Sequence, residues 1–267
     1  MTAITWMLAD GLAVAQRNLI KIKRVPEVLV WVLISPIMFV LLFAFVFGGA
    51  IEVPGMNYRE FLIAGIFAQT VVFGATYTGA GLAEDMQKGI IDRFKSLPMS
   101  RSAVLLGRTG ADIVYNVLSI TIMALTGLVV GWRIHTSALE AAAGFALLLL
   151  FAYAFSWVMA TVGLLVPSPE VVNNASFMVI MPLTFISNAF VPVETLPTAL
   201  KIFAEWNPVS AVTQAARNLF GNTSPLVDVG DAWPMQNPEI YTLIWVVVLV
   251  AVFAPLSVRL YKNAASK

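Results

Sequence analysis

The sequence contains no cysteine and few charged residues. The absence of cysteine from all 267 positions excludes disulfide bonds and thiolate ligation of zinc or iron–sulfur clusters. Charged residues make up 12% of the chain, whereas about 25% is usual in soluble domains. The charges gather in clusters between long uncharged stretches, and this distribution is typical of a membrane protein.

Sequence patterns for nucleotide binding and hydrolysis are missing as well. There is no G-x-x-x-x-G-K-[ST], so the chain has no phosphate-binding loop with which to bind ATP. Neither H-E-x-x-H nor G-x-S-x-G occurs, which leaves little support for a hydrolase. The only histidine, His135, is interpreted as a loop residue at the membrane surface. We therefore predict no catalytic residue, no metal site and no cofactor bound by this chain itself.

Long apolar runs are what the sequence has in abundance. Hydrophobic residues make up 59% of the chain, and its mean hydropathy is +0.85. Six runs are at least 19 residues long, and about 20 helical residues cross a hydrocarbon core. Because backbone groups in lipid must bond internally, we predict an all-α integral membrane protein with six transmembrane helices in one domain, residues 1–267. The runs cover residues 28–51, 61–83, 113–132, 141–169, 171–193 and 240–258.

Basic residues are distributed unequally between the two sides of these spans. With the N-terminus in the cytoplasm, twelve lysines and arginines fall inside and four fall outside. An excess of this kind marks the cytoplasmic side. Both termini are therefore expected in the cytoplasm. The four outside residues are Arg59, Arg133, Lys201 and Arg217.

Residues 1–27 precede the first run and are predicted to contain an amphipathic helix. Apolar residues recur there at intervals of three and four, and Arg17, Lys21 and Arg24 fall on another face. Such a helix lies in the membrane interface with its basic end toward anionic headgroups. Two interpretations remain open, a simple surface anchor and a docking element for a cytoplasmic partner.

The stretch 192–239 is the longest outer connection and contains two short helix-compatible segments. They cover residues 196–206 and 209–220 and are separated by Asn207-Pro208. Each is too short to span a bilayer. We predict two re-entrant or interfacial helices on the outer side, packed against protein before the last span.

The cytoplasmic segment 84–101 is too elaborate for a simple connection between spans. Acidic residues open it and basic residues follow, which suits a short helix over residues 84–95 and its macrodipole. Pro98 then breaks the chain. We predict a short cytoplasmic helix presented to a partner, the alternative being a solvated charged loop.

Two groups of residues resemble those of a known family. The first group comprises Glu84-Asp85, Lys88-Gly89, Arg93 through Arg101, and Gly107-Arg108. The second comprises Ser187 through Pro192, Leu196-Pro197, Asn207-Pro208 and Arg217. Both resemble type-two ABC exporter permeases, in particular the daunorubicin/doxorubicin-resistance permeases of actinobacteria, over essentially the whole chain. Many of those permeases carry Glu-Arg where this chain has Asp92-Arg93, a change that keeps the charge.

The resemblance implies one half of an ATP-driven exporter in the bacterial plasma membrane. Two permease chains, identical or different, would join separate cytoplasmic ATPase subunits that hold ATP and magnesium. Membrane lipid is the other expected partner, and no nucleic acid is expected. Charges of both signs in residues 84–95 would contact the ATPase, while apolar residues recur there at four-residue spacing. The coupling residues expected are Glu84, Asp85, Met86, Lys88, Gly89, Ile90, Arg93 and Phe94.

Ionisable residues are nearly absent from the predicted spans, which argues against a proton-driven carrier. The only candidate is Asp112, at the cytoplasmic end of the third run, and Arg108 precedes it by four residues, so we expect an ion pair between them at the membrane border. A pathway without fixed charges suits an amphipathic or lipid-like substrate such as a drug or a glycolipid. The candidate lining residues, which also suit simple helix packing, are Tyr77, Tyr115, Asn116, Tyr153, Trp157, Asn173 and Phe177.

Two further points stay open in the sequence. Gly127-x-x-x-Gly131 is a candidate close-packing pattern between helices. An ATP-independent secondary carrier or channel is the alternative to an exporter permease, and a membrane scaffold without transport is a third class. Substrate-stimulated ATP hydrolysis by a reconstituted complex would distinguish the first class from the other two.

Overall fold

The structure, a computed structural model, describes residues 10–18, 20, 26–48, 51–96, 101–166 and 168–264. Regular secondary structure in these ranges is helical, and the only extended pairing is an isolated bridge between Val53 and Met56. The prediction of an all-α protein is therefore confirmed.

The helices follow one another along the described chain with short connections. Residues 10–18 are helical. They are followed by α2 (Pro26–Leu41), the π-helical segment η1 (Leu42–Phe47), α3 (Tyr58–Gly74), α4 (Thr76–Gln87), α5 (Ile90–Ser96) and α6 (Arg101–Val130). The second part contains α7 (Ala138–Leu165), α8 (Pro169–Phe185), the 3-10 turn η2 (Val193–Thr195), α9 (Thr198–Trp206), α10 (Pro208–Phe220), α11 (Trp233–Gln236) and α12 (Pro238–Ala264).

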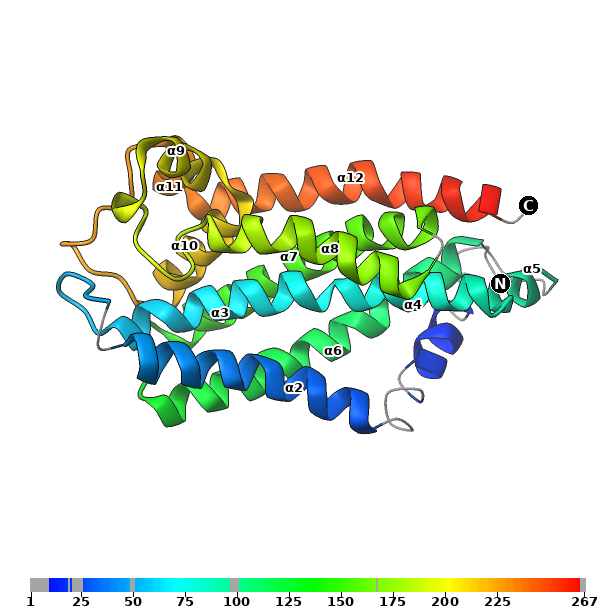
Figure 1. The fold of residues 1–267 in the computed structure, drawn as a ribbon, viewed down its shortest axis with the longest axis horizontal. Coiled ribbons are helices and arrows are strands. Elements are labelled where there is room, and N and C mark those ends of the chain that lie inside the picture. The colour runs from blue at the N-terminus through cyan, green and yellow to red at the C-terminus, as the bar shows by residue number, and fades with distance from the viewer. Residues whose placement is uncertain are drawn as a thin grey trace.

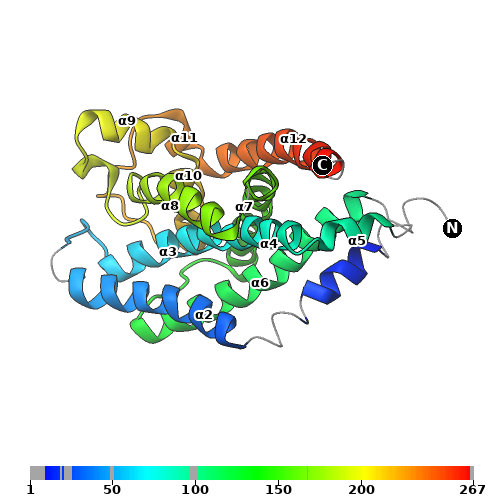
Figure 2. The same ribbon diagram turned by 45° about the vertical axis from the view of Figure 1, so that its right-hand side comes forward.

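The long helices lie side by side in a bundle with two distinct ends (Figure 1). One end carries α5, residues 10–18 and the last turns of α12, and the other carries α9, α10 and α11. The turned view shows the same arrangement (Figure 2). Helix α7 lies inside the bundle and packs against α12, α4, α10 and α6. The two ends correspond to the predicted cytoplasmic and outer segments of the sequence.

Four helical segments in the described ranges are long and apolar enough to cross a membrane, judged by length and composition. They are Tyr58–Gln87, Ala103–Val130, Ala138–Leu165 and Pro238–Asn263, and they correspond to four of the six predicted runs. The first predicted run coincides with α2 and η1, where Ile34–Val46 qualifies as a shorter apolar helix. The fifth coincides with α8, which has 17 residues.

The fifth run is helical only as far as Phe185, so the prediction of a span reaching residue 193 was wrong there. Beyond it, the Asn188 and Ala189 carbonyls accept hydrogen bonds from Arg217 Nη2 at 2.7 and 3.2 Å. The backbone at Ala189 packs directly against α3, since a Cβ at Gly65 would lie 2.0 Å from the Ala189 oxygen. The backbone groups after α8 therefore find tertiary partners instead of continuing the helix.

The two short helices predicted before the last span are present as α9 and α10. Asn207 separates them and begins α10, because its Oδ1 accepts a hydrogen bond from the Val209 amide at 2.9 Å. Pro208 occupies the first helical position, where a backbone N–H would have no partner within the helix, so its absence from proline costs no hydrogen bond. Gly221 ends α10 with a φ of 73°. Local capping residues thus explain both boundaries.

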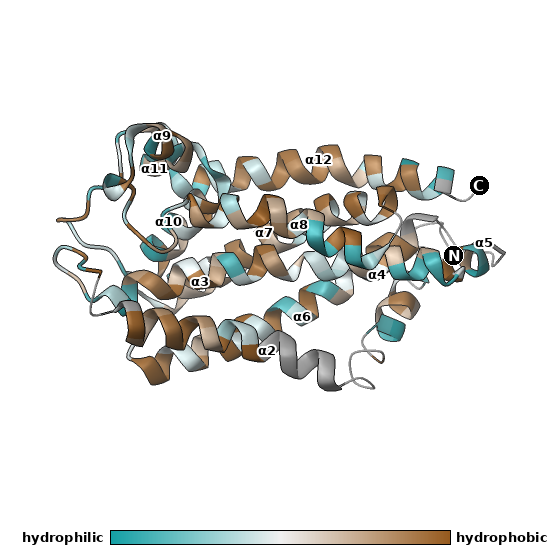
Figure 3. Ribbon diagram, in the orientation of Figure 1, coloured by the Kyte–Doolittle hydropathy of each residue, from teal (hydrophilic) through white to brown (hydrophobic). Residues whose placement is uncertain are grey.

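Hydropathy follows the length of the bundle (Figure 3). Hydrophobic residues run along the long helices, whereas hydrophilic ones gather near α5 at one end and around α9 to α11 at the other. This distribution is that of helices that cross an apolar layer and expose their ends to water.

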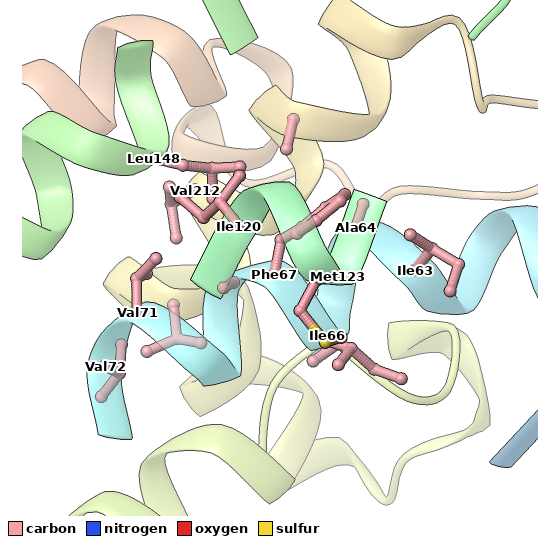
Figure 4. Close-up of a cluster of buried hydrophobic side chains, with 14 of the residues drawn as sticks. Ile63, Ala64, Ile66, Phe67, Val71, Val72, Ile120, Met123, Leu148 and Val212 are labelled. Carbon is pink, nitrogen blue, oxygen red and sulfur yellow. The ribbon is translucent and has the colours of Figure 1, made fainter. Parts of the chain in front are cut away.

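The core is formed by side chains from α3, α6, α7 and α10 (Figure 4). Phe67 of α3 is fully buried and makes edge-on contacts with Trp132 and Phe220, with ring centroids 5.5 and 6.0 Å apart. Lipid tails are as apolar as these side chains, so close packing holds membrane helices together more than removal from water does.

Two glycines bring α4 and α7 into backbone contact. A Cβ on Gly163 would lie 2.2 Å from the Gly79 carbonyl oxygen, and a Cβ on Gly79 would lie 2.6 Å from that of Met159. Of the predicted pair Gly127 and Gly131, only Gly127 is closely packed in the described chain, since a Cβ there would lie 3.3 Å from side-chain atoms of Ile63 and Trp132. Gly131 follows α6 with a φ of +109° and has open space around it.

Candidate functional site

The segment predicted to couple to a partner lies at the bundle end that carries α5 (Figure 1). It is not one helix over residues 84–95, as predicted, because α4 ends at Gln87 and α5 begins at Ile90. Between them Gly89 has a φ of +63°, in the left-handed region that glycine adopts readily. The segment is therefore a helix end, a tight turn and a short second helix.

The turn between α4 and α5 presents charged side chains at the surface. Lys88 and Arg93 are exposed, and Glu84 is half-buried. Lys88 Nζ donates a hydrogen bond to Glu84 Oε1 at 2.5 Å, and this bond raises the pKa of the Lys88 ammonium. These groups are accessible to another molecule.

The apolar side chains of the segment, expected among the coupling residues, differ in burial. Met86 and Phe94 pack against a small cluster of buried residues of the same chain. Of the two adjacent isoleucines, Ile91 is 4% exposed, whereas Ile90, the one expected among the coupling residues, is only half-buried. The sequence offered no way to choose between adjacent isoleucines, because the helix that sets their direction begins at the Gly89 turn.

Asp85, predicted to be a coupling residue, is buried instead of facing solvent. Its Oδ1 lies 2.8 Å from Arg17 Nη2, and its Oδ2 lies 3.8 Å from Arg108 Nη1. Only 8% of its side chain is exposed. Asp85 therefore joins two arginines of the same chain and leaves little surface for a partner.

The predicted ion pair between Arg108 and Asp112 is absent. Arg108 contacts Asp85 and donates from Nη2 to the Tyr77 carbonyl at 3.0 Å. Asp112 accepts a short hydrogen bond from the Thr78 hydroxyl. Both side chains therefore bond to groups of α4 instead of to each other. These tertiary contacts cannot be read from i, i+4 spacing along α6.

Of the N-terminal interface helix, residues 10–18 and 20 are described, whereas Lys21 and Arg24 lie outside the described residues. Val14 is buried in the same small cluster as Leu82, Ile91 and Val104. This part of the chain is therefore packed on protein along one side.

A cavity of about 260 Å³ lies between α2, α3, α4, α6 and α8. Aromatic side chains line it, namely Phe39, Phe73, Tyr77, Tyr115 and Phe177. Neutral polar groups complete it, namely Ser35, Gln69, Thr70, Thr76 and Ser119. No charged side chain belongs to the lining that the described residues form. Such a cavity can hold an apolar ring system and satisfy a few hydroxyl or carbonyl groups.

The predicted pathway residues divide between this cavity and other places. Tyr77, Tyr115 and Phe177 line it. Asn116 is buried beside Gly74 and donates to the Asp112 carbonyl at 2.8 Å. Tyr153 and Trp157 pack edge-on against each other in the cluster around Ile91, away from the cavity lining, and Asn173 is exposed on α8.

At the opposite end of the bundle, Arg217 of α10, one of the four basic residues counted on the outer side, is almost fully buried. Its Nε donates to the Phe61 carbonyl at 2.9 Å, and its guanidinium carbon lies 3.5 Å from the centre of the Phe61 ring. His135, the sole histidine, contacts Glu60 at 3.0 Å on the surface. Across the described ranges, no three His, Cys, Asp or Glu side chains gather as metal ligands would.

The chain matches the model of a protein family described as ABC-2 type transporter over residues 11–220. This match includes the segment around Gly89, the cavity helices and α10.

Several curated relatives are similar over most of the chain. The daunorubicin resistance ABC transporter permease protein DrrB1 of Streptomyces coeruleorubidus is 34% identical over 247 residues, which are 92% of this chain and 84% of that protein. The probable doxorubicin resistance ABC transporter permease protein DrrC of Mycobacterium tuberculosis is 22% identical over 97% of this chain and 90% of its own length. A putative transport permease, ycf38 of Cyanophora paradoxa, is 26% identical over 82% and 77%.

Proposed function

The chain belongs to the ABC-2 type transporter family, and we propose that it is the membrane-spanning subunit of an exporter driven by a separate ATPase. The observation that carries the proposal is a cavity of uncharged aromatic and polar side chains within a bundle that presents a charged turn at one end. The chain has no phosphate-binding loop, so ATP and magnesium would be held by the partner.

We propose six spans, with α2–η1 and α8 completing the four long apolar helices. The two shorter ones lie in the bundle beside the others (Figure 1), and six crossings return the chain to the side where it started. The excess of basic residues in the segments expected on the cytoplasmic side supports placing the α5 end at the cytoplasmic face of the bacterial plasma membrane. Helix α10 would then be re-entrant, since its residues from Val209 to Arg217 are all buried in protein.

The proposed contact with the ATPase is formed by the accessible side chains between Glu84 and Phe94, and the buried Asp85 is not one of them. The exposed Lys88 and Arg93 can form charge-assisted bonds with an acidic surface. Closure of the nucleotide-bound ATPase would displace α5, and a second permease chain would complete the transport pathway.

The proposed substrate is an amphipathic or lipid-like molecule. Rings can stack on the aromatic lining, and the hydroxyl and amide groups can orient a neutral polar edge. The relatives named for resistance to daunorubicin and doxorubicin are consistent with this class. These two drugs are therefore the first probes to use.

Co-purification tests the central claim. The tagged chain, extracted in mild detergent from its native membrane, should retain an ATPase subunit, and the complex in vesicles should hydrolyse ATP. Arg93→Glu should lower retention of the ATPase about tenfold. The glutamate cannot form the bond that arginine makes, and the acidic surface of the ATPase repels its negative charge. The matched control is Arg133→Glu at the other end. Absence of any ATPase from the wild-type preparation contradicts the proposal.

The cavity assignment predicts an effect of Phe177→Ala on substrate concentration dependence. Phe177 packs edge-on against Phe73, with centroids 6.1 Å apart, and closes one side of the cavity. An aromatic contact contributes about 0.5–1.5 kcal/mol, so half-maximal stimulation of ATP hydrolysis by daunorubicin should need about two- to twelvefold more drug. Met178→Ala, at the exposed neighbouring position, should change it little. Equal effects of the two variants would refute this site.

A single observation favours a second candidate, an ATP-independent carrier. Asp112 is an acidic residue within α6, and such residues often handle protons in carriers. Transport in vesicles that contain this chain without any ATPase, driven by an imposed proton gradient and lost in Asp112→Asn, would support that function over the exporter.

A further inference from the structure

One buried carboxylate connects the proposed ATPase contact to the rest of the chain. Asp85 sits in the last turns of α4, where it faces Arg17 on one side and Arg108 on the other, at 2.8 and 3.8 Å. The two arginines come from different elements, the helix over residues 10–18 and α6. Both carboxylate oxygens are therefore used within the chain.

On the cytoplasmic side, Arg17 reaches across the Gly89 turn. Its guanidinium carbon lies 5.1 Å from the centre of the Phe94 ring on α5, while its Nη2 pairs with Asp85 on α4. A cation over an aromatic face is attracted to it. Arg17 thus contacts the segments before and after the turn, and a movement of α5 would carry it along.

On the membrane side, Arg108 extends the connection to the cavity. Its Nη2 donates to the carbonyl of Tyr77, whose side chain lines the cavity. The guanidinium passes over Gly81, where a Cβ would lie 1.6 Å from Nη2. With any larger residue at position 81, the Arg108 guanidinium would have to shift from this place. The contacts from Phe94 through Arg17, Asp85 and Arg108 therefore end at a residue of the cavity wall.

The helix over residues 10–18 has a second attachment that holds it against α6. A Cβ on Gly107 would lie 2.4 Å from the Gly11 carbonyl oxygen and 2.7 Å from the Val14 Cβ. Val14 itself is buried. This helix therefore packs on α6 at Gly11 and Val14 and pairs with α4 at Arg17.

We propose that Asp85 is the positioning residue that transmits displacement of α5 to the cavity through Arg17 and Arg108. Separating a buried carboxylate from both of its cationic partners is strongly unfavourable, so the three elements move together when one is pushed. The inference rests on the proposed function, because the push comes from the ATPase. To the proposed function the inference adds the residue that transmits the displacement of α5 and the contacts through which that displacement reaches Tyr77.

The test uses the full complex of this chain with its ATPase and needs no substrate. Because the chain has no cysteine, Ser35→Cys introduces a single thiol at the cavity for an environment-sensitive fluorophore, attached before the ATPase is added. MgATP with vanadate is the probe, and it should shift the emission of the labelled wild-type chain. In Asp85→Asn the shift should fall about fivefold or more, while the ATPase stays bound and basal hydrolysis stays within about twofold. Asp231→Asn, an exposed outer-loop acid, should retain the full shift.

Combining Asp85→Asn with Arg17→Gln tests whether Asp85 and Arg17 act through the interaction between them. Arg17 is a third exposed, so Arg17→Gln perturbs folding less than a change at the buried acid. If each single variant lowers the shift about fivefold, the double variant should also lower it about fivefold instead of 25-fold, because both remove the same interaction.

The outcomes separate the two claims. A full shift in Asp85→Asn, a multiplicative double variant, or a loss of the ATPase from Asp85→Asn would each overturn the positioning role and leave the proposed function intact. An unresponsive wild-type label beside active ATP hydrolysis would overturn it as well. A wild-type chain that binds no ATPase would overturn the proposed function and this inference with it.

Discussion

Replacing Arg217 with methionine is expected to lower the thermal unfolding midpoint by about 6–12 °C, a loss of about 3 kcal/mol. Arg217 is 1% exposed and donates to three carbonyls, those of Phe61 on α3 and of Asn188 and Ala189 after α8. Methionine fills a similar volume but donates no hydrogen bond. Carbonyl oxygens left buried without a donor cost about 1–3 kcal/mol each.

Burial of the charge opposes this loss only in part. A guanidinium taken out of water is costly, so methionine gains something by removing it. The balance still favours arginine, because three bonds to a charged donor and the contact with the Phe61 ring at 3.5 Å act together. They also join α3, α8 and α10, which methionine cannot do.

The measurement is a thermal melt of detergent-purified protein followed by tryptophan fluorescence. Arg133→Met is the matched control, since Arg133 is exposed and bonds only to nearby carbonyls of Leu128 and Trp132. Its midpoint should stay within about 3 °C of wild type. Arg217→Lys should fall between, because one ammonium cannot reach all three carbonyls. A wild-type midpoint for Arg217→Met would refute the structural role of this residue.

Substituting Gly163 by alanine should destabilise the bundle by about 3 kcal/mol, although only one methyl group is added. A Cβ there would lie 2.2 Å from the Gly79 carbonyl oxygen. Its position is fixed by the α7 backbone and that of the oxygen by the α4 backbone, so neither atom can rotate away. Helices α4 and α7 must separate to admit it. Because α4 leads into the Gly89 turn, the variant should also lower retention of the ATPase.

Gly110→Ala is the control for this second prediction. Gly110 is also helical, but a Cβ there would meet nothing within 4 Å. Alanine should therefore leave the protein unchanged or stabilise it by up to about 1 kcal/mol through helix propensity. Melting midpoints and gel-filtration profiles of both variants decide the matter, and equal stability of Gly163→Ala and wild type would show that the crossing is looser than described.

Properties that depend on neighbours in sequence were predictable. Asn207-Pro208 placed the start of α10, since an Asn cap and a Pro at the first helical position act within one turn. Apolar length located the long helices, because a bilayer imposes it on each helix separately. The turn at Gly89 between α4 and α5 was not predicted, because a glycine among charged residues does not by itself indicate a positive φ.

Pairings between helices were not predictable, and the charged residues show why. Spacing along α6 favoured Arg108 with Asp112, yet the structure pairs Arg108 with Asp85 and Asp112 with Thr78, both from α4. Which side chains meet depends on where two helices cross, and hydropathy does not record the crossing point. Glycine spacing similarly pointed to Gly127, whereas the backbone contact of α4 and α7 forms elsewhere.

By itself, therefore, the sequence determined the number of apolar runs, the side on which basic residues gather, and the resemblance to the family. The first two follow from the lipid and water that each stretch of chain must face. Only the tertiary structure decided that Arg217 is buried, that three of the candidate pathway residues share a cavity, and that Asp85 faces two arginines. Each of these depends on contacts between segments far apart in the chain, where packing geometry selects one partner among several of the same chemistry.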